Sequence, residues 1–421
     1  MNKKSTVDLI HGPILPSLIS FALPILLSNI FQQLYNTADI LIVGRFLGQD
    51  SLAAVGATTA IFDLIIGFAL GVGNGMGVVI ARLYGARNFA KIKEAVAATW
   101  ILGAILSGLV MLMGFFGLYP LLQYLETPAE ILPQSYEYIS MIVSCVGVSF
   151  AYNLFAGLLR SIGDSLAALA FLIFSAIVNV ILDLYFITQL QLGVQSAGLA
   201  TIISQGLSAI LCYFYIRKSV PELLPGLKHF KWNKALYVDL LEQGLAMGLM
   251  GSIVSIGSVI LQSSVNSFGA VIISTQTAAR RIMAFALLPM TAISASMTTF
   301  ISQNFGAKRP ERIVQGLRIG SYLSMSWATF ACVFLFFASP SLVSFLASST
   351  DGYLIENGTL YLRISSVFYP FLSLLLIYRN SLQGLGQKFL PLVSSFIEFF
   401  GKIIFVAWII PWAGYTGVIL C

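Results

Sequence analysis

Three aspartates interrupt stretches of the sequence that are otherwise apolar, and they suggest the first hypothesis about function. They are Asp39, Asp63 and Asp183. An aspartate at the centre of a bilayer costs about 3 kcal/mol on insertion scales, so such residues usually serve a function. Carboxylate oxygens suit hard cations such as Na⁺, and carboxylates that are desolvated and close together can carry H⁺. The alternative is that each aspartate meets headgroups or water at the membrane interface.

The sequence predicts a protein without catalytic machinery. Its two histidines, His11 and His229, lie near the ends of apolar stretches, and it has no HExxH, GxSxG or P-loop motif. Its four cysteines form no CxxC pair, so neither a metal cluster nor a disulfide is indicated. We expect no enzyme activity, no cofactor and no bound metal beyond Na⁺. Active transport without a nucleotide site needs an ion gradient, and one charge crossing 100 mV yields about 2.3 kcal/mol.

Membrane-spanning helices must position these aspartates. Hydrophobic residues make up 58% of the 421 residues and charged residues 10%, whereas about a quarter of the residues in a soluble domain are charged. Since a spanning helix needs roughly 20 apolar residues, we predict an all-α polytopic helix bundle in a lipid bilayer. The eleven apolar stretches lie near residues 14–39, 53–81, 95–119, 136–159, 166–188, 196–216, 240–265, 275–302, 317–346, 361–382 and 390–412.

Lysines and arginines mark alternate connections between these stretches. Basic residues follow the second, fourth, eighth and tenth stretches at Arg82, Arg160, Lys308 and Lys388, and Arg45 is the main exception. By the positive-inside rule, these connections and the N-terminus are cytoplasmic. The three aspartates then fall in the outer half of the first six stretches. The net charge of +6 is therefore a topology signal, and we expect no nucleic-acid partner.

The two halves of the chain resemble each other. Residues 80–92 (IARLYGARNFAKI) and 301–313 (ISQNFGAKRPERI) share a frame at an offset of 306 − 85 = 221, and LLRSIGDS (158–165) matches SLQGLGQK (381–388) at nearly the same offset. Parallel repeats with the substrate path between them are a transporter architecture. We expect two parallel six-helix repeats around a central cavity: an N-terminal lobe (1–216), a cytoplasmic linker (217–239) and a C-terminal lobe (240–421).

The second repeat is expected to be incomplete. The sixth stretch opens with GLATIISQGL (198–207), and its counterpart would begin near Gly417, close to Cys421 at the end of the given sequence. The expected twelfth helix is missing, either by truncation or as a real variation.

Several segments together resemble the multidrug and toxic compound extrusion (MATE) family. FALPILLSNIFQQLYNTADILIVGRFLG (21–48) is similar to the first helix of these transporters, with its proline and its aspartate followed by VGxxLG. LYGARN (83–88) resembles the family's second connection, and LLRSIGDS with NVILD (179–183) resembles its fourth and fifth helices. The resemblance implies a V-shaped pair of six-helix lobes that exports amphipathic, often cationic, compounds in exchange for H⁺ or Na⁺.

The resemblance also implies a cation site in the first lobe. Asp39, Asn179, Asp183 and Thr201 match the family's site, and Tyr138 is a looser match as a hydrogen-bond partner. Asn179 lies one turn before Asp183, so both residues share a helix face. Two carboxylates with amide and hydroxyl oxygens suit Na⁺, and the carboxylates alone suit H⁺.

Some residues within the apolar stretches have two interpretations each. Pro24 is either a static kink or a hinge, and Pro289 and Pro370 also lie within stretches. Asp63 lines the cavity or is merely interfacial. Glu398 and Lys402, spaced i,i+4, form a neutralising pair or line the cavity.

Two further features concern the lobes. Glycines at 67, 71 and 75 recur every fourth residue, which indicates close helix packing rather than a nucleotide loop. Glu242 lies at the cytoplasmic end of the seventh stretch and the tenth has no acid, so we do not expect a matching cation site in the second lobe.

The predicted function is cation-coupled export of amphipathic or cationic drugs by a monomer in a bacterial or archaeal plasma membrane. A lipid-linked oligosaccharide flippase ranks second. It would need several cations in the cavity, and the candidates Arg280, Arg281 and Arg363 lie near the ends of stretches. A membrane enzyme and a channel are weaker hypotheses, the first because the sequence contains no catalytic set of residues.

Overall fold

The fold is a bundle of long helices. The computed structural model describes residues 6–125, 127–266, 268–347 and 352–421, and within these ranges it contains no β-strand. The long helices are α1 (Ile14–Phe46), α2 (Gln49–Gly85), α3 (Phe89–Tyr124), α4 (Leu132–Ser144), α5 (Val146–Ser161), α6 (Ser165–Thr188), α7 (Gln195–Ser219), α8 (Lys234–Asn266), α9 (Ala270–Gly306), α10 (Pro310–Ala347), α11 (Gly352–Val367), α12 (Tyr369–Gly384) and α13 (Phe389–Ile404). The short ones are η1 (Pro221–Leu223), η2 (Leu227–His229), η3 (Phe405–Ile409), α14 (Ile410–Ala413) and α15 (Tyr415–Leu420).

The number of membrane spans agrees with the predicted eleven when each bent helix pair is counted as one span. Over the described ranges, nine spans are single helices or continuous helical runs, and two are bent pairs, α4 with α5 and α11 with α12, each bent by 50°. Several spans are longer than predicted because polar residues extend them past the apolar stretch. Helix α1 continues to Phe46, so Asp39 lies two turns inside the helix rather than at its end.

The two bends occur at equivalent places in the repeats. Cys145 separates α4 from α5 and Phe368 separates α11 from α12, an offset of 368 − 145 = 223. Pro370 follows the second break and accounts for it, because proline cannot donate the helical hydrogen bond. The first break, at Cys145, has no proline beside it, and the sequence analysis did not predict this break.

The backbone confirms the internal repeat. Gly48 and Gly269 precede α2 and α9 with φ of 89° and 86°. Arg87 and Lys308, in the loops after those helices, both adopt the left-handed conformation with φ of 54° and 55°. A non-glycine residue seldom takes this conformation, so its recurrence at an offset of 308 − 87 = 221 shows that the two loops fold alike.

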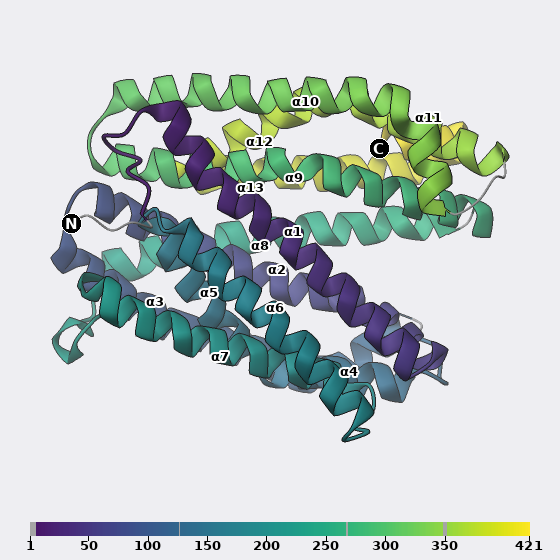
Figure 1. Cartoon of the computed structure of the whole chain (residues 1–421), viewed down its shortest axis with the longest axis horizontal. Coiled ribbons are helices and arrows are strands. Elements are labelled where there is room, and N and C mark those ends of the chain that lie inside the picture. The colour runs from purple at the N-terminus through teal and green to yellow at the C-terminus, as the bar shows by residue number, and fades with distance from the viewer. Residues whose placement is uncertain (1–5, 126, 267, 348–351) are drawn as a thin grey trace.

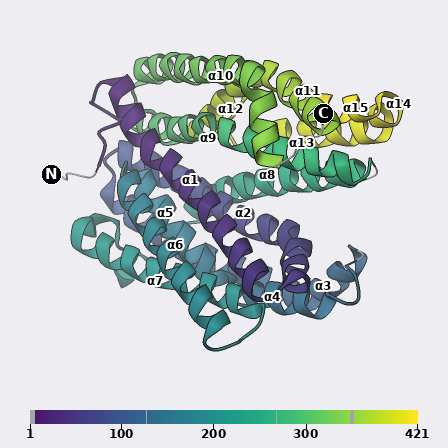
Figure 2. The same cartoon turned by 45° about the vertical axis from the view of Figure 1, so that its right-hand side comes forward.

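The helices form two groups (Figure 1). We call α1–α7 the first lobe and α8–α15 the second lobe. Helix α1 runs diagonally from the side of α10 to the side of α4, across both groups, in both views (Figures 1 and 2). The segment between α7 and α8 spans 220–233, shorter than the predicted linker, because Lys234 and Asp239 belong to the first turns of α8.

The packing of α1 changes along its length. Before and at Pro24, its buried residues Leu18 and Phe21 belong to an apolar cluster with Met297 and Phe300 of the second lobe. After Pro24, Val43 belongs to the core of the first lobe. The apolar contacts of α1 with the second lobe thus lie around and before Pro24, where the carbonyl of Phe21 also accepts a bond from Ser165 of the first lobe at 3.0 Å, and its later residue Val43 packs in the first lobe.

Glycines let α2 approach two neighbours closely, as the spacing predicted. A Cβ on Gly71 would lie 2.6 Å from the Cα of Gly248 in α8, and one on Gly75 would collide with the carbonyl oxygen of Gln243. On another face, a Cβ on Gly73 would lie 2.8 Å from the carbonyl oxygen of Asn153 in α5. Helix α2 thus joins the lobes through one face and the first-lobe core through the other.

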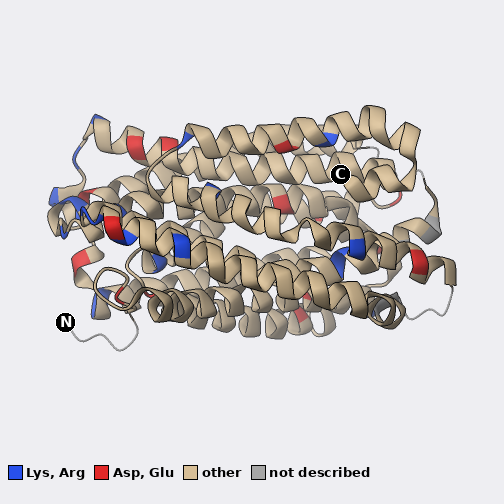
Figure 3. Cartoon of the chain, turned by 90° about the horizontal axis from the view of Figure 1, so that it is seen from above, with Lys and Arg blue, Asp and Glu red and all other residues tan. Residues whose placement is uncertain are grey.

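Most lysines and arginines gather at one end of the bundle, where the N-terminus lies (Figure 3). This end holds the connections after α2, α5, α7, α9 and α12, and we call it the basic end. Several acidic residues, coloured red, lie along the helices away from the ends in the same view. The structure thus separates a cationic rim from buried carboxylates.

Candidate functional site

A polar cluster lies within the first lobe, toward the end opposite the basic end. Asp39 comes from α1, Asn179 and Asp183 from α6, and Thr201 from the first turns of α7. All four are buried: 8% of Asp39 is exposed, 2% of Thr201, and none of Asn179 or Asp183. Helices α6 and α7 are joined by a short turn, which brings Thr201 beside the last turns of α6. The structure therefore brings together the four residues predicted for the cation site.

A tyrosine that the sequence analysis missed completes the cluster. The hydroxyl of Tyr35 lies 3.0 Å from Thr201 Oγ1, and Asn179 Nδ2 donates to the same oxygen at 3.3 Å. Tyr35 precedes Asp39 by one helical turn, so both residues share a face of α1. That i,i+4 spacing is the signal that could have identified it.

The cluster contains oxygen atoms without donors. Asp39 Oδ1, Asn179 Oδ1 and both carboxylate oxygens of Asp183 are buried and accept no hydrogen bond from any described residue. The two carboxylates are close enough to influence each other's charge, and a bond between them would require a proton on one. Since buried polar groups are normally paired, this arrangement fits a proton or an oxygen-loving cation such as Na⁺. Asp39, Asp183, Asn179 and Thr201 would hold it.

The cluster opens onto a cavity between the lobes. This outer cavity has a volume of about 610 Å³ and is lined by Asp39, Asp63 and Tyr138 on the first-lobe side. Helix α9 contributes Arg281 and Phe285 from the other lobe. Asp63 therefore lines the cavity, one of its two predicted interpretations. Tyr138 also lines the cavity, and only 4% of it is exposed.

The second lobe has no equivalent of this cluster at the matching positions. At the offset of 221, Asp39 corresponds to Ile260 (39 + 221 = 260). At the offset of 223 that relates Gly163 and Gly386, Asp183 corresponds to Val406 and Asn179 to Lys402. The repeat is therefore symmetric in backbone and asymmetric in buried charge.

An ion network occupies the second lobe instead. Lys402 Nζ lies 3.1 Å from Glu398 Oε1, which confirms the predicted pair. Arg379, which the sequence analysis missed, adds a second cation 3.2 Å from Glu398 Oε2 and also bonds Ser394 Oγ at 2.9 Å. With two cations and one anion, these three residues are not neutral as a set.

A different network fixes the basic end of α8. Lys388 lies 2.6 Å from Glu242 and 2.9 Å from Asp239, and Asp239 also pairs with Arg82 of α2. The surrounding carboxylates outweigh the effect of burial and raise the pKa of Lys388. Glu242 thus takes part in a bridge between helices.

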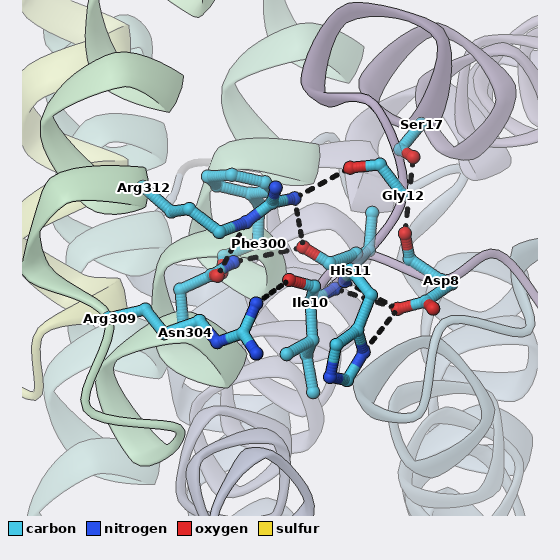
Figure 4. A network of polar contacts seen from close by, with 10 residues as sticks. Asp8, Ile10, His11, Gly12, Ser17, Phe300, Asn304, Arg309 and Arg312 are labelled. Carbon is cyan, nitrogen blue, oxygen red and sulfur yellow. Dashed lines mark hydrogen bonds and ion pairs between the residues drawn. The ribbon is translucent and has the colours of Figure 1, made fainter.

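The segment before α1 contacts both lobes at the basic end, and Figure 4 shows its bonds to Asn304, Arg309 and Arg312 of the second lobe. We call residues 6–13 the strap. The carbonyl oxygens of the strap accept bonds from Arg309 (2.9 Å to Ile10), Arg312 (2.8 Å to Gly12) and Asn304 (3.0 Å to Leu9), all of the second lobe. Its Val7 N–H donates to the carbonyl of Gly163 in the first lobe at 3.0 Å. The strap therefore bridges the loop after α9 and the loop after α5.

Asp8 shapes the strap. Its Oδ1 accepts bonds from the backbone N–H groups of His11 and Ile10 at 2.8 and 3.0 Å. Burial alone would raise the pKa of Asp8, but these bonds outweigh it and lower the pKa below its usual value. The stabilisation that Asp8 adds is present above about pH 4 and is lost only as the pH falls through the lowered pKa.

Helices α2 and α9 also meet at the basic end. A Cβ on Gly85 would collide with the carbonyl oxygen of Gln303, and one on Gly306 with that of Arg82. In addition, Gln303 Nε2 donates to the carbonyl of Ser161 at 2.8 Å. The lobes are thus in close contact at the basic end, while the outer cavity lies between them farther along.

Comparison with known proteins places this geometry in a family. The family model described as MatE matches residues 24–185 and 246–409, one segment in each lobe. The chain is 27% identical to the probable multidrug resistance protein YpnP of Bacillus subtilis, with 98% of this chain and 92% of that protein covered. It is 26% identical to an FAD transporter of Shewanella oneidensis, with 93% and 87% covered.

Solved structures show the same fold. An outward-facing multidrug resistance MATE family transporter of the MOP superfamily superposes with a TM-score of 0.89 at 23% identity, covering 100% of this chain and 94% of that one. A MATE structure in the bent conformation also gives 0.89, at 22% identity, with the same coverage. The matched segments cover most of the chain, so this multi-pass membrane protein belongs to the MATE family of transporters.

Proposed function

We propose that this protein is an antiporter that exports amphipathic or cationic compounds across the plasma membrane of a bacterium or archaeon in exchange for H⁺ or Na⁺. The observation that carries the proposal is the set of buried oxygens at Asp39, Asn179 and Asp183 that have no donor among the described residues. They lie beside a cavity between the lobes. A site that lacks positive charge next to a substrate-sized cavity supports exchange of a cation for a cationic compound.

The orientation is part of the proposal. The positive-inside rule supports a cytoplasmic basic end and N-terminus. Because the lobes touch at that end, the described conformation then faces outward. The outer cavity would be the route by which the compound leaves.

In the proposed cycle, Asp39 and Asp183 take up the cation from the outside. Neutralising this pair removes the repulsion between α1 and α6, and α1 changes its packing around Pro24. Since α1 packs on the second lobe around Leu18 and Phe21 and on the first lobe at Val43, a bend at Pro24 would alter the contact between lobes. The loaded protein then turns inward, releases the cation and binds new compound.

The relatives and the cavity lining support an amphipathic compound. Proteins named as probable multidrug resistance proteins match most of the chain. The outer cavity combines Phe62 and Phe285 with the carboxylates of Asp39 and Asp63. Apolar walls with a few polar groups are typical of small-molecule sites. We further propose that the protein works as a monomer without a cofactor.

The flippase hypothesis has less support. Of its candidate cations, Arg281 lines the outer cavity. Arg280 bonds Gln262 at 3.0 Å and Arg363 bonds the carbonyl of Phe336 at 2.9 Å. Two of the three guanidiniums are therefore already engaged in structural contacts.

The test uses purified protein in liposomes loaded with tetramethylrhodamine methyl ester, a fluorescent lipophilic cation. A pH gradient and a Na⁺ gradient are imposed separately, and export under either one identifies the coupling ion. The double variant Asp39→Asn, Asp183→Asn should lose export while it unfolds at a temperature no lower than wild type. Normal export by a folded double variant would refute the coupling site.

A further inference from the structure

A second cavity lies between the lobes, nearer the basic end, and the proposed function does not use it. It has a volume of about 240 Å³. Its lining comes from α1, α2, α5, α6, α8, α9 and α12. The polar side chains that line it include Asn29, Asn74, Arg160, Thr298 and Asn380. We call it the inner cavity.

Arg160 gives the inner cavity a positive charge that no carboxylate neutralises among the described residues. Its Nη2 donates to Asn74 Oδ1 at 2.9 Å, the single acceptor that the described part of the chain offers it. The acid nearest in sequence, Asp164, is engaged elsewhere: its Oδ1 accepts from the N–H of Ala167 and its Oδ2 from the hydroxyl of Tyr215. A guanidinium has five N–H donors. Because only one of them is used by Asn74, the others can donate to a molecule in the cavity that Arg160 lines.

An unpaired charge within a membrane protein is costly and usually marks a substrate or ion pathway. The group that this site lacks is an anion. A guanidinium matches the planar oxygens of a carboxylate or a phosphate with two parallel hydrogen bonds. The amide of Asn29 can donate a further bond to the same anion, and so can the second N–H of the Asn380 amide, whose first N–H donates to the carbonyl of Leu376 at 2.9 Å.

We propose that the inner cavity binds the anionic group, a carboxylate or a phosphate, of the compound that the protein carries. Transport of that compound rests on the proposed function, but binding of the anion does not. Toward the basic end the lobes meet next to this cavity: Gln303 bonds the carbonyl of Ser161, which lines the cavity, and Gly85 contacts Gln303. Separation of the lobes at that end would expose Arg160, so this site loads from the side opposite the Asp39 cluster.

The test compares two probes that differ in charge and little in shape. 4-Fluorobenzoate carries a carboxylate, and 4-fluorobenzamide is its neutral analogue. Binding is measured by ¹⁹F NMR line broadening with the full chain in nanodiscs of phosphatidylcholine, which has no net negative charge. Wild type should bind the benzoate at least roughly tenfold more tightly than the benzamide, the discrimination expected of a charge-assisted pair.

Two variants should each prevent anion binding, one by removing the guanidinium and the other by neutralising it. Arg160→Gln removes the guanidinium and should abolish the preference for benzoate. Asn74→Asp keeps Arg160 but puts a carboxylate where the 2.9 Å partner now lies, so the internal ion pair should also abolish it. Lys91→Gln, which removes an exposed positive charge at the basic end, should leave the preference unchanged. Arg160→Lys keeps the charge without the fork and should give an intermediate result.

Inorganic phosphate added to the wild-type sample identifies the anion. Displacement of the benzoate points to a phosphate group, and no displacement points to a carboxylate. Equal binding of the two probes by wild type, or an unchanged preference in both Arg160→Gln and Asn74→Asp, would overturn the proposal. Absence of export under any gradient would refute the proposed function and leave the anion site intact, since binding is measured separately.

Discussion

The pair Asp39 and Asp183 is unusual because two buried carboxyl groups influence each other's charge, while no arginine or lysine forms an ion pair with either one in the described part of the chain. Two buried like charges that interact resist simultaneous ionisation when no counter-charge is present. One proton shared by the pair, or one cation bound between the carboxylates, removes the electrostatic repulsion between them. A proton and a cation would then compete for the same atoms.

The first prediction concerns this pair alone. Asp39→Asn removes one of the two charges and supplies an amide N–H that can donate to Asp183. At pH 8.5 without Na⁺, we expect the variant to be more stable than wild type by about 1 kcal/mol, the net worth of a typical hydrogen bond. Thermal unfolding of the purified protein measures this. Export should be lost at the same time.

Asp63→Asn is the matched control for that experiment. Asp63 lines the same cavity but has no hydrogen bond or ion pair within the described ranges. We expect its unfolding temperature to change little. A fall in the stability of Asp39→Asn, to or below that of the control, would show that the pair is not a source of repulsion.

The sequence identified the two acids of the site but missed Tyr35 and the position of Arg160, for different reasons. Asp39 and Asp183 stood out because each is an acid in an apolar stretch. Tyr35 did not, since a tyrosine in a spanning helix needs no special explanation. Arg160 was read as a marker of topology, because its place at the end of a helix did not reveal the cavity that its side chain lines.

Helix α2 shows how a single element joins two different environments. Gly71 and Gly75 face α8 of the second lobe, and Gly73 faces α5 of its own lobe. The two faces alternate because residues two apart lie on opposite sides of a helix, whereas residues four apart share one. Small residues on both faces let the backbones come close enough for van der Waals packing to hold the helices together.

The second prediction concerns this packing. Gly75→Ala puts a Cβ onto the carbonyl oxygen of Gln243 and must push α8 away. We expect a loss of about 1–3 kcal/mol, the usual cost of overpacking. Gly67→Ala, at a position where an added Cβ meets nothing within 4 Å, is the control and should retain wild-type stability. The readout is thermal unfolding in one detergent, and equal unfolding temperatures for the two variants would contradict the close contact.

At the scale of elements, sequence periodicity predicted the number of spans and missed some of their details. The break at Cys145 carries no proline, so only its position opposite Phe368 in the repeat identifies it. The glycine spacing predicted close packing but not the partner helix, because a stripe of small residues does not specify what faces it. Charged residues at helix ends, such as Lys234, were read as loop although they extend the helix beyond the lipid.

The whole molecule is held closed at the basic end by contacts that join the lobes independently. The strap bonds Arg309, Arg312 and Asn304 of the second lobe and Gly163 of the first. Helices α2 and α9 meet through close backbone contacts. An alternating transporter must break such contacts in every cycle, so their strength sets how much time the protein spends in each conformation.

The third prediction concerns the strap. Arg312→Ala removes bonds to the carbonyls of Leu9 and Gly12 and to Asn304 Oδ1. If these are worth about 2 kcal/mol together, the closed basic end becomes roughly thirtyfold less populated relative to the open one. Spin labels on Lys91 of α3 and Glu311 of α10, both exposed, report the separation by double electron–electron resonance. The distribution should gain a longer distance.

Arg318→Ala serves as the control, because this arginine lies two turns farther along α10, beyond the bonds of the strap. Its label-to-label distances should match those of wild type. An unchanged distribution in Arg312→Ala would mean that the backbone contacts of α2 with α9 keep the basic end closed without the strap.

The contact between α2 and α9 is self-reciprocal. Gly85 meets Gln303 while Gly306 meets Arg82, and both pairs obey the same offset, since 306 − 85 and 303 − 82 are each 221. In a two-fold dimer of identical subunits, residue i touches residue j of the partner and j touches i. A half-length polypeptide with this sequence pattern would pair with a second copy of itself through the same surface. In such a dimer, every substitution in this surface would occur on both sides of the contact. In the fused chain each half can change separately, and the buried acids Asp39 and Asp183 of the first half and the cations Arg379 and Lys402 of the second show that they have diverged.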